Sequence, residues 1–345
     1  MTKFSGLVLH RNFSLRSYNS FGLDVAASYF VQINDLSDLE DLYKSELWKR
    51  ERKLILGGGS NTLFLDDYFE GLVLWVNNKG ISLSETKNDM VRVSVAAGED
   101  WPGFVQQMLN QGLGGLENLS LIPGKVGASP IQNIGAYGVE VKDVFQGLLA
   151  FDMETGVIVD ISAKECDFGY RSSAFKTVWK NRFLIISVDF LLSTKPQLKL
   201  DYGAIRAELL RMGVREPGIR EVGLAVSNIR RSKLPDPSQL GNAGSFFKNP
   251  VVHQLVFNDL KQEFTDIVGH PDKNQTVKLS AAWLIERAGW KNRRKGNVGV
   301  FQHQALVIVN FGNATGREIF GYAMEIQHSV KEMFGIELEP EVNFV

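Results

Sequence analysis

One stretch constrains the fold of this chain more than any other: GLENLSLIPGKVGASPIQNIGAYGVEV, from Gly115 to Val141. It interleaves small residues with amide, hydroxyl and apolar side chains, and an ordinary loop has no need of that mixture. A main chain that wraps closely around a large ligand does need it, because glycine lets the backbone approach the ligand. A long structural Ω-loop is the alternative interpretation of the same residue types.

Strand and helix patterns lie on both sides of this stretch and predict an α+β chain without an internal repeat. Leucines at helical spacing indicate a helix over residues 36–53, with Ser37 as its N-cap. The turn at Thr155-Gly156 indicates a β-hairpin between two alternating segments. Further predicted elements are strands over residues 91–98, 182–192 and 305–310 and helices over residues 99–112, 219–233, 277–290 and 317–335.

Length and composition limit the class of protein. A chain of 345 residues is expected to form two or three domains, and LPDPSQLGNAGS, residues 234–245, is the clearest boundary. The net charge of -1 argues against nucleic acid or an anionic membrane as a partner. Five scattered histidines and the single Cys166 offer no metal site and no intrachain disulfide. Because no apolar run suits a signal peptide or a membrane span, we expect a cytoplasmic protein.

A second glycine-rich segment, LGGGSNTLF, runs from Leu56 to Phe64 directly after a predicted strand. Consecutive N–H groups there can form a nest for phosphate oxygens, and Ser60 and Asn61 can add side-chain donors. A tight turn explains the glycines equally well. The segment matches neither the dinucleotide fingerprint G-x-G-x-x-G nor a Walker loop.

Three other segments carry side chains that suit an anionic ligand. FGYRSSAFK holds Tyr170 beside Arg171, whose planar fork fits a carboxylate or a phosphate, although a surface ion pair is the simpler interpretation. LDYGAI holds Tyr202 at a predicted turn. The basic turn KNRRKGN, residues 291–297, suits either solvent or a nucleotide phosphate.

Two segments near the C-terminal end leave a choice open. ELEPEVNF places Glu337, Glu339 and Glu341 at period two, which fits an exposed edge or one acid that faces a cationic site. GNAGSFFKNP, residues 241–250, contains Ser245, which is either a turn residue or a proton donor. Lys248 in that segment has no assigned role and is expected to face solvent.

Taken together and in this order, these segments resemble the MurB family of UDP-N-acetylenolpyruvoylglucosamine reductases, from NSFGLD near residue 20 to EPEV at the end. The most specific are IPGKVGASPIQNIGAYGVE, FGYRSSAFK, LPDP and GNAGSFFKNP. The resemblance implies an α+β chain with a two-subdomain FAD-binding fold of the vanillyl-alcohol-oxidase (PCMH) type and a C-terminal α+β domain. We therefore predict FAD-binding subdomains over residues 1–80 and 81–232. A substrate-binding domain is predicted over residues 233–345, and its final strand can return to the FAD-binding domain.

The resemblance also implies the cofactor. FAD is expected to be bound non-covalently, because no histidine lies between His10 and His253 and neither glycine-rich segment can attach it. The FAD-binding residues that the resemblance implies are Gly57, Gly58, Gly59, Ser60, Asn61, Pro123, Gly124, Gly127, Ser129, Gln132, Asn133, Gly135, Ala136, Tyr137 and Gly138.

The implied reaction belongs to peptidoglycan precursor synthesis and has two halves. NADPH gives hydride to the flavin, which then reduces the enolpyruvyl ether of UDP-N-acetylglucosamine enolpyruvate to UDP-N-acetylmuramate. Ser245 matches the family's proton donor. Arg171 matches the arginine that suits the carboxylate and enolate oxygens, and Glu341 matches the acid that polarises this carboxylate or fixes the arginine.

Substrate contacts follow from the same resemblance. The residues that fall where the family binds the UDP-sugar are Tyr170, Tyr202, Lys233, Asn249 and Gln304. Tyr202 marks the subtype that closes a tyrosine-bearing loop over the diphosphate. The small-molecule substrate is the expected partner, and we expect a monomer.

Two other classes of function fit parts of the pattern. A flavin oxidase or dehydrogenase of the same fold would have no need of the set Arg171, Ser245 and Glu341. A nucleotide-binding regulatory module would bind through the same loops without turnover. A protein that cannot be loaded with FAD would exclude both flavoenzyme interpretations.

Overall fold

The computed structural model describes residues 7–345, and their contacts divide the chain into two compact units. Unit 1 contains the residues up to Phe13 together with Ala27–Gly58 and Glu70–Arg231. Unit 2 contains Ser14–Ala26, Gly59–Phe69 and Ser232–Val345. Two segments of the first predicted domain, residues 14–26 and 59–69, therefore group with the C-terminal residues.

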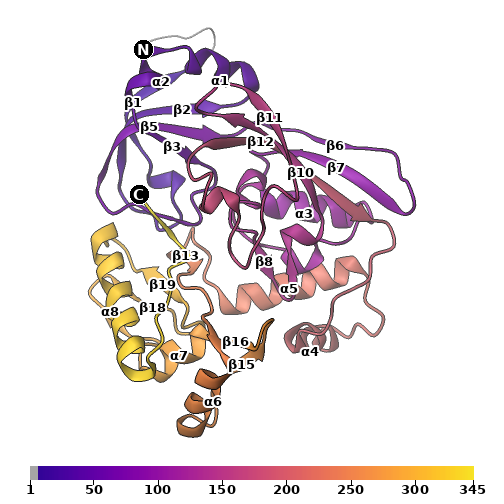
Figure 1. The fold of residues 1–345 in the computed structure, drawn as a ribbon, viewed down its shortest axis with the longest axis vertical. Helices are drawn as coiled ribbons and strands as arrows, with labels where there is room; N and C mark the ends of the chain where they lie inside the picture. Colours follow the sequence, from indigo (N-terminus) through magenta and orange to yellow (C-terminus); the bar gives the residue numbers. More distant parts are fainter. Residues whose placement is uncertain (1–6) are drawn as a thin grey trace. The chain divides into compact units, whose positions relative to one another are not determined.

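Two main sheets form unit 1 (Figure 1). The four-stranded sheet has the order β1 (Leu9–Ser14), β2 (Ala26–Ile33), β5 (Tyr68–Val76) and β3 (Lys53–Leu56). The five-stranded antiparallel sheet has the order β11 (Ile158–Ser162), β10 (Phe145–Asp152), β12 (Phe183–Ser193), β7 (Met90–Ala96) and β6 (Ile81–Leu83). The helices are α1 (Leu36–Tyr43), α2 (Glu46–Arg50), α3 (Trp101–Asn110), α4 (Gly203–Arg211) and α5 (Ile219–Lys233).

The five-stranded sheet forms because its strands alternate apolar and polar side chains. In β7, Val91, Val93 and Val95 are buried and their neighbours Arg92 and Ser94 are not. The buried face packs against α3, where the Trp101 and Phe104 rings lie 6.0 and 5.3 Å from the ring of Phe190 in β12. Helices α4 and α5 bury a smaller core of their own, formed by Ile205, Leu209, Val222, Ala225, Val226 and Ile229.

Unit 2 also combines small sheets with helices. A four-stranded sheet has the order β13 (Gly241–Ser245), β19 (Val307–Asn310), β18 (Val298–Val300) and β17 (Arg294–Lys295). A three-stranded sheet has the order β14 (Val251–His253), β16 (Thr276–Leu279) and β15 (Gly269–Pro271). The strands β20 (Asn343–Phe344) and β4 (Thr62–Leu63) form a two-stranded sheet. The helices of unit 2 are α6 (Gln254–Glu263), α7 (Ala281–Arg287) and α8 (Gly316–Phe334). Helix α8 contacts β18 and β19 (Figure 1), and a Thr315–Glu318 capping box and left-handed Gly335 mark its ends.

The helix predictions for residues 99–112, 219–233 and 317–335 are confirmed apart from one or two terminal residues, and the 155–156 hairpin joins β10 to β11. The single helix over residues 36–53 is wrong. Ser45 accepts the N–H of Trp48 and starts a second helix, while Asp35, not Ser37, caps the first. The helix over residues 277–290 is also too long, because Val277 belongs to β16 and Ser280 caps α7.

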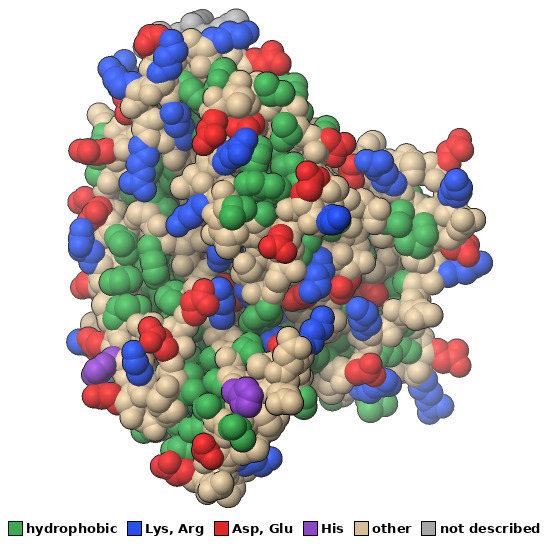
Figure 2. All heavy atoms as spheres, viewed as in Figure 1, with side chains coloured by type: hydrophobic (Ala, Val, Ile, Leu, Met, Phe, Trp, Pro, Cys, Tyr) green, Lys and Arg blue, Asp and Glu red, His purple; other side chains and the backbone are tan. Residues whose placement is uncertain are grey.

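The surface carries charges of both signs. On the face drawn in Figure 2, lysine and arginine side chains are interspersed with aspartate and glutamate, as the net charge of -1 suggests. Within residues 7–345, no helix has the length and apolar character that crossing a bilayer requires.

One ion pair with a buried carboxylate secures the β10–β11 hairpin. Asp152, 2 % exposed, accepts hydrogen bonds from Arg182 Nη2 at 2.8 Å and from the N–H groups of Glu154 and Thr155 at 2.9 and 3.4 Å. Burial raises the pKa of Asp152, but these hydrogen bonds outweigh it, so the pKa lies below its ordinary value. Because the carboxyl pKa is lower in the folded state than in the unfolded state, Asp152 contributes its full stabilisation of the folded protein at pH values above the unfolded-state pKa. This contribution to the free energy of unfolding is lost as the pH falls through the folded-state pKa.

We predict that Asp152→Asn lowers the free energy of unfolding by about 2 kcal/mol at neutral pH, because hydrogen bonds to a charged group contribute roughly 1.5–3 kcal/mol. The deficit should shrink as pH falls through the folded pKa of Asp152. Urea unfolding at several pH values measures both effects. Glu154→Gln is the matched control: its carboxylate is 71 % exposed and 3.8 Å from Arg182, so its loss should be below about 0.5 kcal/mol. Equal losses in the two variants would contradict a role for the buried pair.

Candidate active site

The first glycine-rich segment approaches the second at the end of β3. A Cβ atom added to Gly58 would lie 3.0 Å from the Cα of Gly124, so both positions depend on the absence of a side chain. Trp75 donates its indole N–H to the Gly57 carbonyl at 3.0 Å and fixes the start of the turn. On the other side, the N–H of Trp101 donates to Gly124 O at 3.0 Å. Two backbone turns thus meet closely at Gly58 and Gly124 and form a cradle.

The long stretch from Gly115 to Val141 forms a chain of short turns, with 3₁₀ helices at Glu117–Leu119, Val126–Ala128 and Val141–Asp143. Its polar side chains are buried and mostly bonded. Asn133, 0 % exposed, donates to Gly169 O at 3.0 Å and Glu140 Oε2 at 3.1 Å and accepts the N–H of Lys142 at 3.1 Å. The two hydrogen bonds donated by the Asn133 amide therefore hold the loop in its conformation.

Arg171 lies in a tight turn that this stretch anchors. Its guanidinium donates to the carbonyls of Gly135 and Asn133 and stacks over the Tyr170 ring at 5.4 Å. A Cβ atom on Gly135 would lie 2.9 Å from both Arg171 Nη1 and the Val139 carbonyl oxygen, and because the main-chain oxygen cannot easily move, glycine is required there. The φ angles of Arg171, Asn133 and Tyr137 are +50°, +46° and +50°. Left-handed backbone at non-glycine residues gathers at functional sites, because the surrounding structure must hold it there.

Tyr137 and Tyr202 form the neighbouring aromatic pair. Their rings meet edge to face at 5.6 Å, and Tyr202, at the N-cap of α4, is 52 % exposed. Burial raises the pKa of Tyr137, against an opposing effect of Arg230, so its hydroxyl stays protonated at neutral pH. Unit 1 thus gathers Arg171, Tyr170, Tyr137 and Tyr202 around the Asn133–Gly138 loop.

In unit 2, a strap of residues 15–25 holds the rest of the GGGSN loop. Asn19 closes the strap by bonding to the Leu15 and Leu23 carbonyls at 2.9 and 3.0 Å and to the Leu23 N–H at 2.9 Å. A Cβ atom on Gly59 would lie 2.0 Å from Tyr18 O, and one on Gly241 would lie 2.2 Å from Phe21 O. The same strap therefore fixes the loop of Gly59 and the first residue of β13.

Ser245 ends β13 after a bulge. Asn242 and Ser245 pair with Val309 and Val307, so two residues of β13 face one of β19, and Gly244 within the bulge has φ +69°. A β-bulge changes the direction in which the following side chain points, and bulges are common beside active sites. The Phe246 and Phe247 rings that follow are both 1 % exposed. Ser245 is therefore the last residue of its strand, and the two residues that follow it are buried in the core.

The C-terminal segment pairs with the residues that follow Ser245. The N–H of Glu341 donates to Phe246 O at 2.8 Å, and the N–H of Lys248 donates to Glu339 O at 2.9 Å. Asn61 also reaches this segment, since its Nδ2 donates to Glu341 O at 3.2 Å. The predicted proton donor, the predicted acid and the glycine-loop amide therefore belong to adjoining backbone segments of one unit.

The three acids of this segment separate into two kinds. Glu337 and Glu339 are exposed and form ion pairs with Lys331, at 2.8 Å, and with Lys248. Glu341 is less exposed than either. The expectation that Lys248 faces solvent is wrong, because its side chain is only 13 % exposed and forms an ion pair with Glu339.

Three other predicted substrate residues belong to unit 2, and two of them adjoin β13 or β19. Asn249 accepts the N–H of Ala281 at 2.9 Å and so joins the end of the Ser245 segment to α7. Gln304 lies in the turn before β19, where its carbonyl accepts the N–H of Val307, the partner of Ser245. Lys233 is exposed at the end of α5.

The basic turn of residues 291–297 has partners within unit 2. Lys291 and Lys295 form ion pairs with Glu286, at 2.9 Å, and Glu325, at 2.5 Å. The guanidinium groups of Arg293 and Arg294 lie 4.3 and 4.2 Å from the ring centroids of Trp290 and Phe311. These contacts favour the solvated-turn interpretation over a phosphate site.

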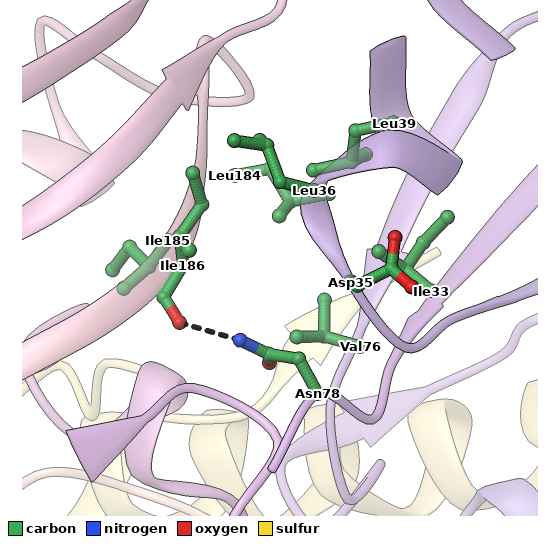
Figure 3. A pocket seen from close by; sticks show the side chains of 9 residues that line it. All are labelled: Ile33, Asp35, Leu36, Leu39, Val76, Asn78, Leu184, Ile185 and Ile186. Carbon is green, nitrogen blue, oxygen red and sulfur yellow. Dashed lines mark hydrogen bonds between the residues drawn. The ribbon is translucent and has the colours of Figure 1, made fainter. Parts of the chain in front are cut away.

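A small pocket in unit 1 lies away from these residues (Figure 3). Its volume is about 10 Å³, and Asn78 closes one side by donating to Ile186 O at 2.8 Å. That volume suits one water molecule. None of the predicted site residues lines it: the lining is Ile33, Asp35, Leu36, Leu39, Val76, Asn78, Leu184, Ile185 and Ile186.

The residues of the glycine-rich segments fit FAD. Ser129 is 1 % exposed, and its Oγ atom has no hydrogen-bond partner among residues 7–345. A buried hydroxyl without a partner calls for an explanation, and a polar cofactor supplies one. The close approach at Gly58 and Gly124 leaves N–H groups suited to phosphate oxygens. Cys166, by contrast, is buried, which raises its pKa to about 12 and leaves an inert thiol.

Sequence reasoning missed Arg230, whose Nε donates to Leu121 O at 3.2 Å within the long glycine-rich stretch. The signal was present: Arg230 follows Val222 and Val226 at intervals of four, on the buried face of α5. It also missed the strap residue Asn19, whose role depends on hydrogen bonds that no pattern encodes.

Comparison with known proteins gives the family. Residues 27–162 match the model of an FAD binding domain, and residues 236–345 match that of the UDP-N-acetylenolpyruvoylglucosamine reductase C-terminal domain. The UDP-N-acetylenolpyruvoylglucosamine reductases of Pseudomonas putida and Pseudomonas aeruginosa are each 47% identical to the chain. The first alignment covers 96% of this chain and 97% of the relative, and the second covers 98% and 99%.

The fold agrees with these matches. The crystal structure of the Thermus caldophilus reductase superposes with a TM-score of 0.67 at 23% identity, over 98% of this chain and 99% of that one. The predicted fold class is therefore confirmed, and so is the prediction of an FAD-dependent oxidoreductase. The chain belongs to the UDP-N-acetylenolpyruvoylglucosamine reductase family.

Proposed function

We propose that this protein is an NADPH-dependent flavoenzyme that reduces the enolpyruvyl ether of UDP-N-acetylglucosamine enolpyruvate, which yields the peptidoglycan precursor UDP-N-acetylmuramate. The observation that carries the proposal is the pairing of the Ser245–Lys248 and Glu339–Glu341 segments. It sets a serine hydroxyl and a carboxylate on adjoining backbone, next to the glycine-loop residue Asn61. An oxidase of the same fold has no use for this proton-donor arrangement.

FAD, when bound, supplies the hydride chemistry, accepting hydride from NADPH and giving it to the methylene carbon of the substrate. Addition of hydride pushes the π electrons of the double bond toward the carboxylate and creates enolate charge. Arg171, fixed by the Gly135 and Asn133 carbonyls, binds that carboxylate and stabilises the charge. Ser245 gives a proton to the neighbouring carbon and regains one from solvent. Glu341 polarises the carboxylate or orients the arginine.

The remaining residues bind the ligands. Gly57 to Asn61 and Pro123 to Gly138 hold FAD, through N–H groups at the cradle and through the Ser129 hydroxyl. Tyr170, Tyr202, Lys233, Asn249 and Gln304 contact the UDP-sugar, and the exposed half of Tyr202 is the part that the sugar nucleotide can reach. We further propose that the enzyme acts as a cytoplasmic monomer.

The first test separates the two half-reactions. Ser245→Ala should leave flavin reduction by NADPH within about twofold of wild type, because the hydroxyl has no part in it. Reoxidation of the reduced flavin by UDP-N-acetylglucosamine enolpyruvate should slow by about 100-fold or more, the usual effect of losing a positioned proton donor. Anaerobic stopped-flow absorbance of the flavin measures both rates.

Ser238→Ala, at an exposed serine of the same unit, is the control and should leave both rates unchanged. Reoxidation of the Ser245→Ala enzyme at the wild-type rate would refute the proton-donor role while leaving the FAD proposal intact.

The second test concerns FAD itself. Ser129→Ala should leave the apoprotein as stable as wild type, because the hydroxyl it removes has no partner, and should weaken FAD binding about tenfold. Ser173→Ala is matched in burial, but its Oγ donates to Ile131 O at 2.6 Å. That variant should instead lose about 1 kcal/mol of apoprotein stability. Fluorescence titration with FAD and urea unfolding of the apoproteins give the two quantities. Unchanged FAD affinity in Ser129→Ala would count against the assignment.

A further inference from the structure

Asn118 bonds to two separate segments of unit 1 at once. It belongs to the 3₁₀ helix at Glu117–Leu119 and is only 1 % exposed. Its Nδ2 atom donates to Tyr137 O at 2.8 Å and to Lys199 O at 3.0 Å. The first carbonyl lies in the stretch proposed to hold FAD, and the second lies three residues before Tyr202. One amide therefore bridges the cofactor stretch and the segment that leads to the tyrosine proposed to contact the substrate.

The segment before Tyr202 has few hydrogen bonds of its own. Residues 194–202 lie between β12 and α4 and contain neither helix nor strand. Within the part of the chain that the structure describes, the bond from Asn118 is the only hydrogen bond that the main chain of residues 196–201 makes. A segment with so few hydrogen bonds has little local stability, so its position depends on what holds its main chain.

The side chains of this segment restrain it less specifically. Leu198 and Leu200 pack against the core between α4 and α5, and an apolar contact of this kind has no direction. Lys199 pairs with Asp143 at 3.3 Å, but the lysine side chain is 55 % exposed, and exposed ion pairs contribute little. The hydrogen bond from Asn118 is therefore the restraint that fixes where a main-chain atom of the segment lies.

The two carbonyls that Asn118 holds lead to one aromatic contact. The rings of Tyr137 and Tyr202 meet edge to face with their centroids 5.6 Å apart. A Cβ atom on Gly138 would lie 4.0 Å from Tyr202 Cδ2, so the Tyr202 ring also lies beside the next residue of the turn. Tyr137 has φ +50°, a backbone conformation that the surrounding structure must hold. Asn118 therefore holds the main chain on both sides of the aromatic pair.

The orientation of the Asn118 amide follows from its partners. Two carbonyl oxygens can accept only from the NH₂ group, so Nδ2 must face Tyr137 and Lys199. The Oδ1 atom is then buried without a hydrogen-bond partner among residues 7–345. A buried unpaired acceptor costs stability, which offsets part of what the two donated bonds contribute. This balance favours a role for Asn118 in positioning over one in stability alone.

We propose that Asn118 is a positioning residue for the sugar nucleotide. It holds Tyr202 against the turn of Tyr137 and Gly138, in the position from which Tyr202 contacts the substrate. This inference rests on the function proposed above and assigns no chemistry to Asn118 itself. Removal of the amide should therefore weaken substrate binding and leave the chemical steps almost unchanged.

The test measures binding of UDP-N-acetylglucosamine enolpyruvate to the oxidised, FAD-loaded protein, which cannot turn over without a reductant. Asn118→Ala should raise the Kd about tenfold, and kcat at saturating substrate should stay within about threefold of wild type. Asn118→Ser keeps a hydroxyl that can donate to one of the two carbonyls, so its Kd should lie between those of wild type and Asn118→Ala. Isothermal titration calorimetry gives the Kd, and steady-state assays give kcat.

Two variants control for effects that do not pass through the Asn118 amide. Lys199→Met removes the exposed ion pair with Asp143 but keeps the carbonyl that Asn118 bonds. Asp152→Asn destabilises unit 1 at the β10–β11 hairpin instead. Both should bind the substrate within about twofold of wild type. A rise in Kd in either control as large as in Asn118→Ala would overturn the proposal, because the main-chain bond would then not be the cause.

A double-mutant cycle tests whether Asn118 acts through Tyr202. Tyr202→Ala should raise the Kd in the wild-type background. In the Asn118→Ala background it should change the Kd by less than about twofold, because Tyr202 is already displaced there. Effects that multiply independently would overturn the proposal, and so would an unchanged Kd in either single variant.

Two further outcomes are distinct from these. If Asn118→Ala does not fold, the same cycle on Asn118→Ser decides, and independent effects there would again overturn the proposal. Wild-type protein that neither binds nor reduces this substrate would refute the proposed function, and this inference with it. Wild-type protein that turns the substrate over while Asn118→Ala binds it equally well would refute only the role of Asn118.

Discussion

The backbone pairing of residues 246–248 with residues 339–341 is the interaction on which the candidate chemistry of unit 2 depends. Two hydrogen bonds, Glu341 N–H to Phe246 O at 2.8 Å and Lys248 N–H to Glu339 O at 2.9 Å, tie the end of the chain to the strand that carries Ser245. The buried Phe246 and Phe247 rings prevent that strand from sliding. Parallel pairing of Asn343 with Thr62 then joins the same segment to the strand after the glycine loop. A proton donor needs this rigidity, because its hydroxyl must stay within hydrogen-bond reach of one carbon.

Unit 1 solves a different physical problem, the orientation of two guanidinium groups by main-chain carbonyls. The carbonyls of Gly135 and Asn133 accept hydrogen bonds from Arg171, and the carbonyl of Leu121 accepts one from Arg230. Hydrogen bonds from a guanidinium to fixed main-chain oxygens set its orientation. The left-handed φ angles at Leu121, Asn133 and Arg171 are the backbone consequence of pointing these groups inward.

Much of this arrangement could be predicted from the sequence. The long periodic helices α5 and α8 were placed almost to the residue. The order of motifs singled out the glycine-rich segments, Arg171, Ser245 and Glu341, whose roles stay predictions. The short helices α2 and α7 could not be placed, because each begins at a serine within a continuous apolar pattern. Ser45 and Ser280 start these helices through a single side-chain hydrogen bond each. The position of Lys248 depended on a carboxylate 91 residues away, and that of Arg230 on a hydrogen bond to the Leu121 carbonyl. Sequence periodicity reports neither kind of pairing.

The most direct measurement of the central claim is an anaerobic single turnover. The FAD-loaded protein is reduced with NADPH and mixed with UDP-N-acetylglucosamine enolpyruvate, while flavin absorbance and product are followed together. The account predicts that the oxidised flavin spectrum returns at the rate at which UDP-N-acetylmuramate appears. A reduced flavin that persists with this substrate but is promptly reoxidised by molecular oxygen would contradict the account and indicate an oxidase of the same fold.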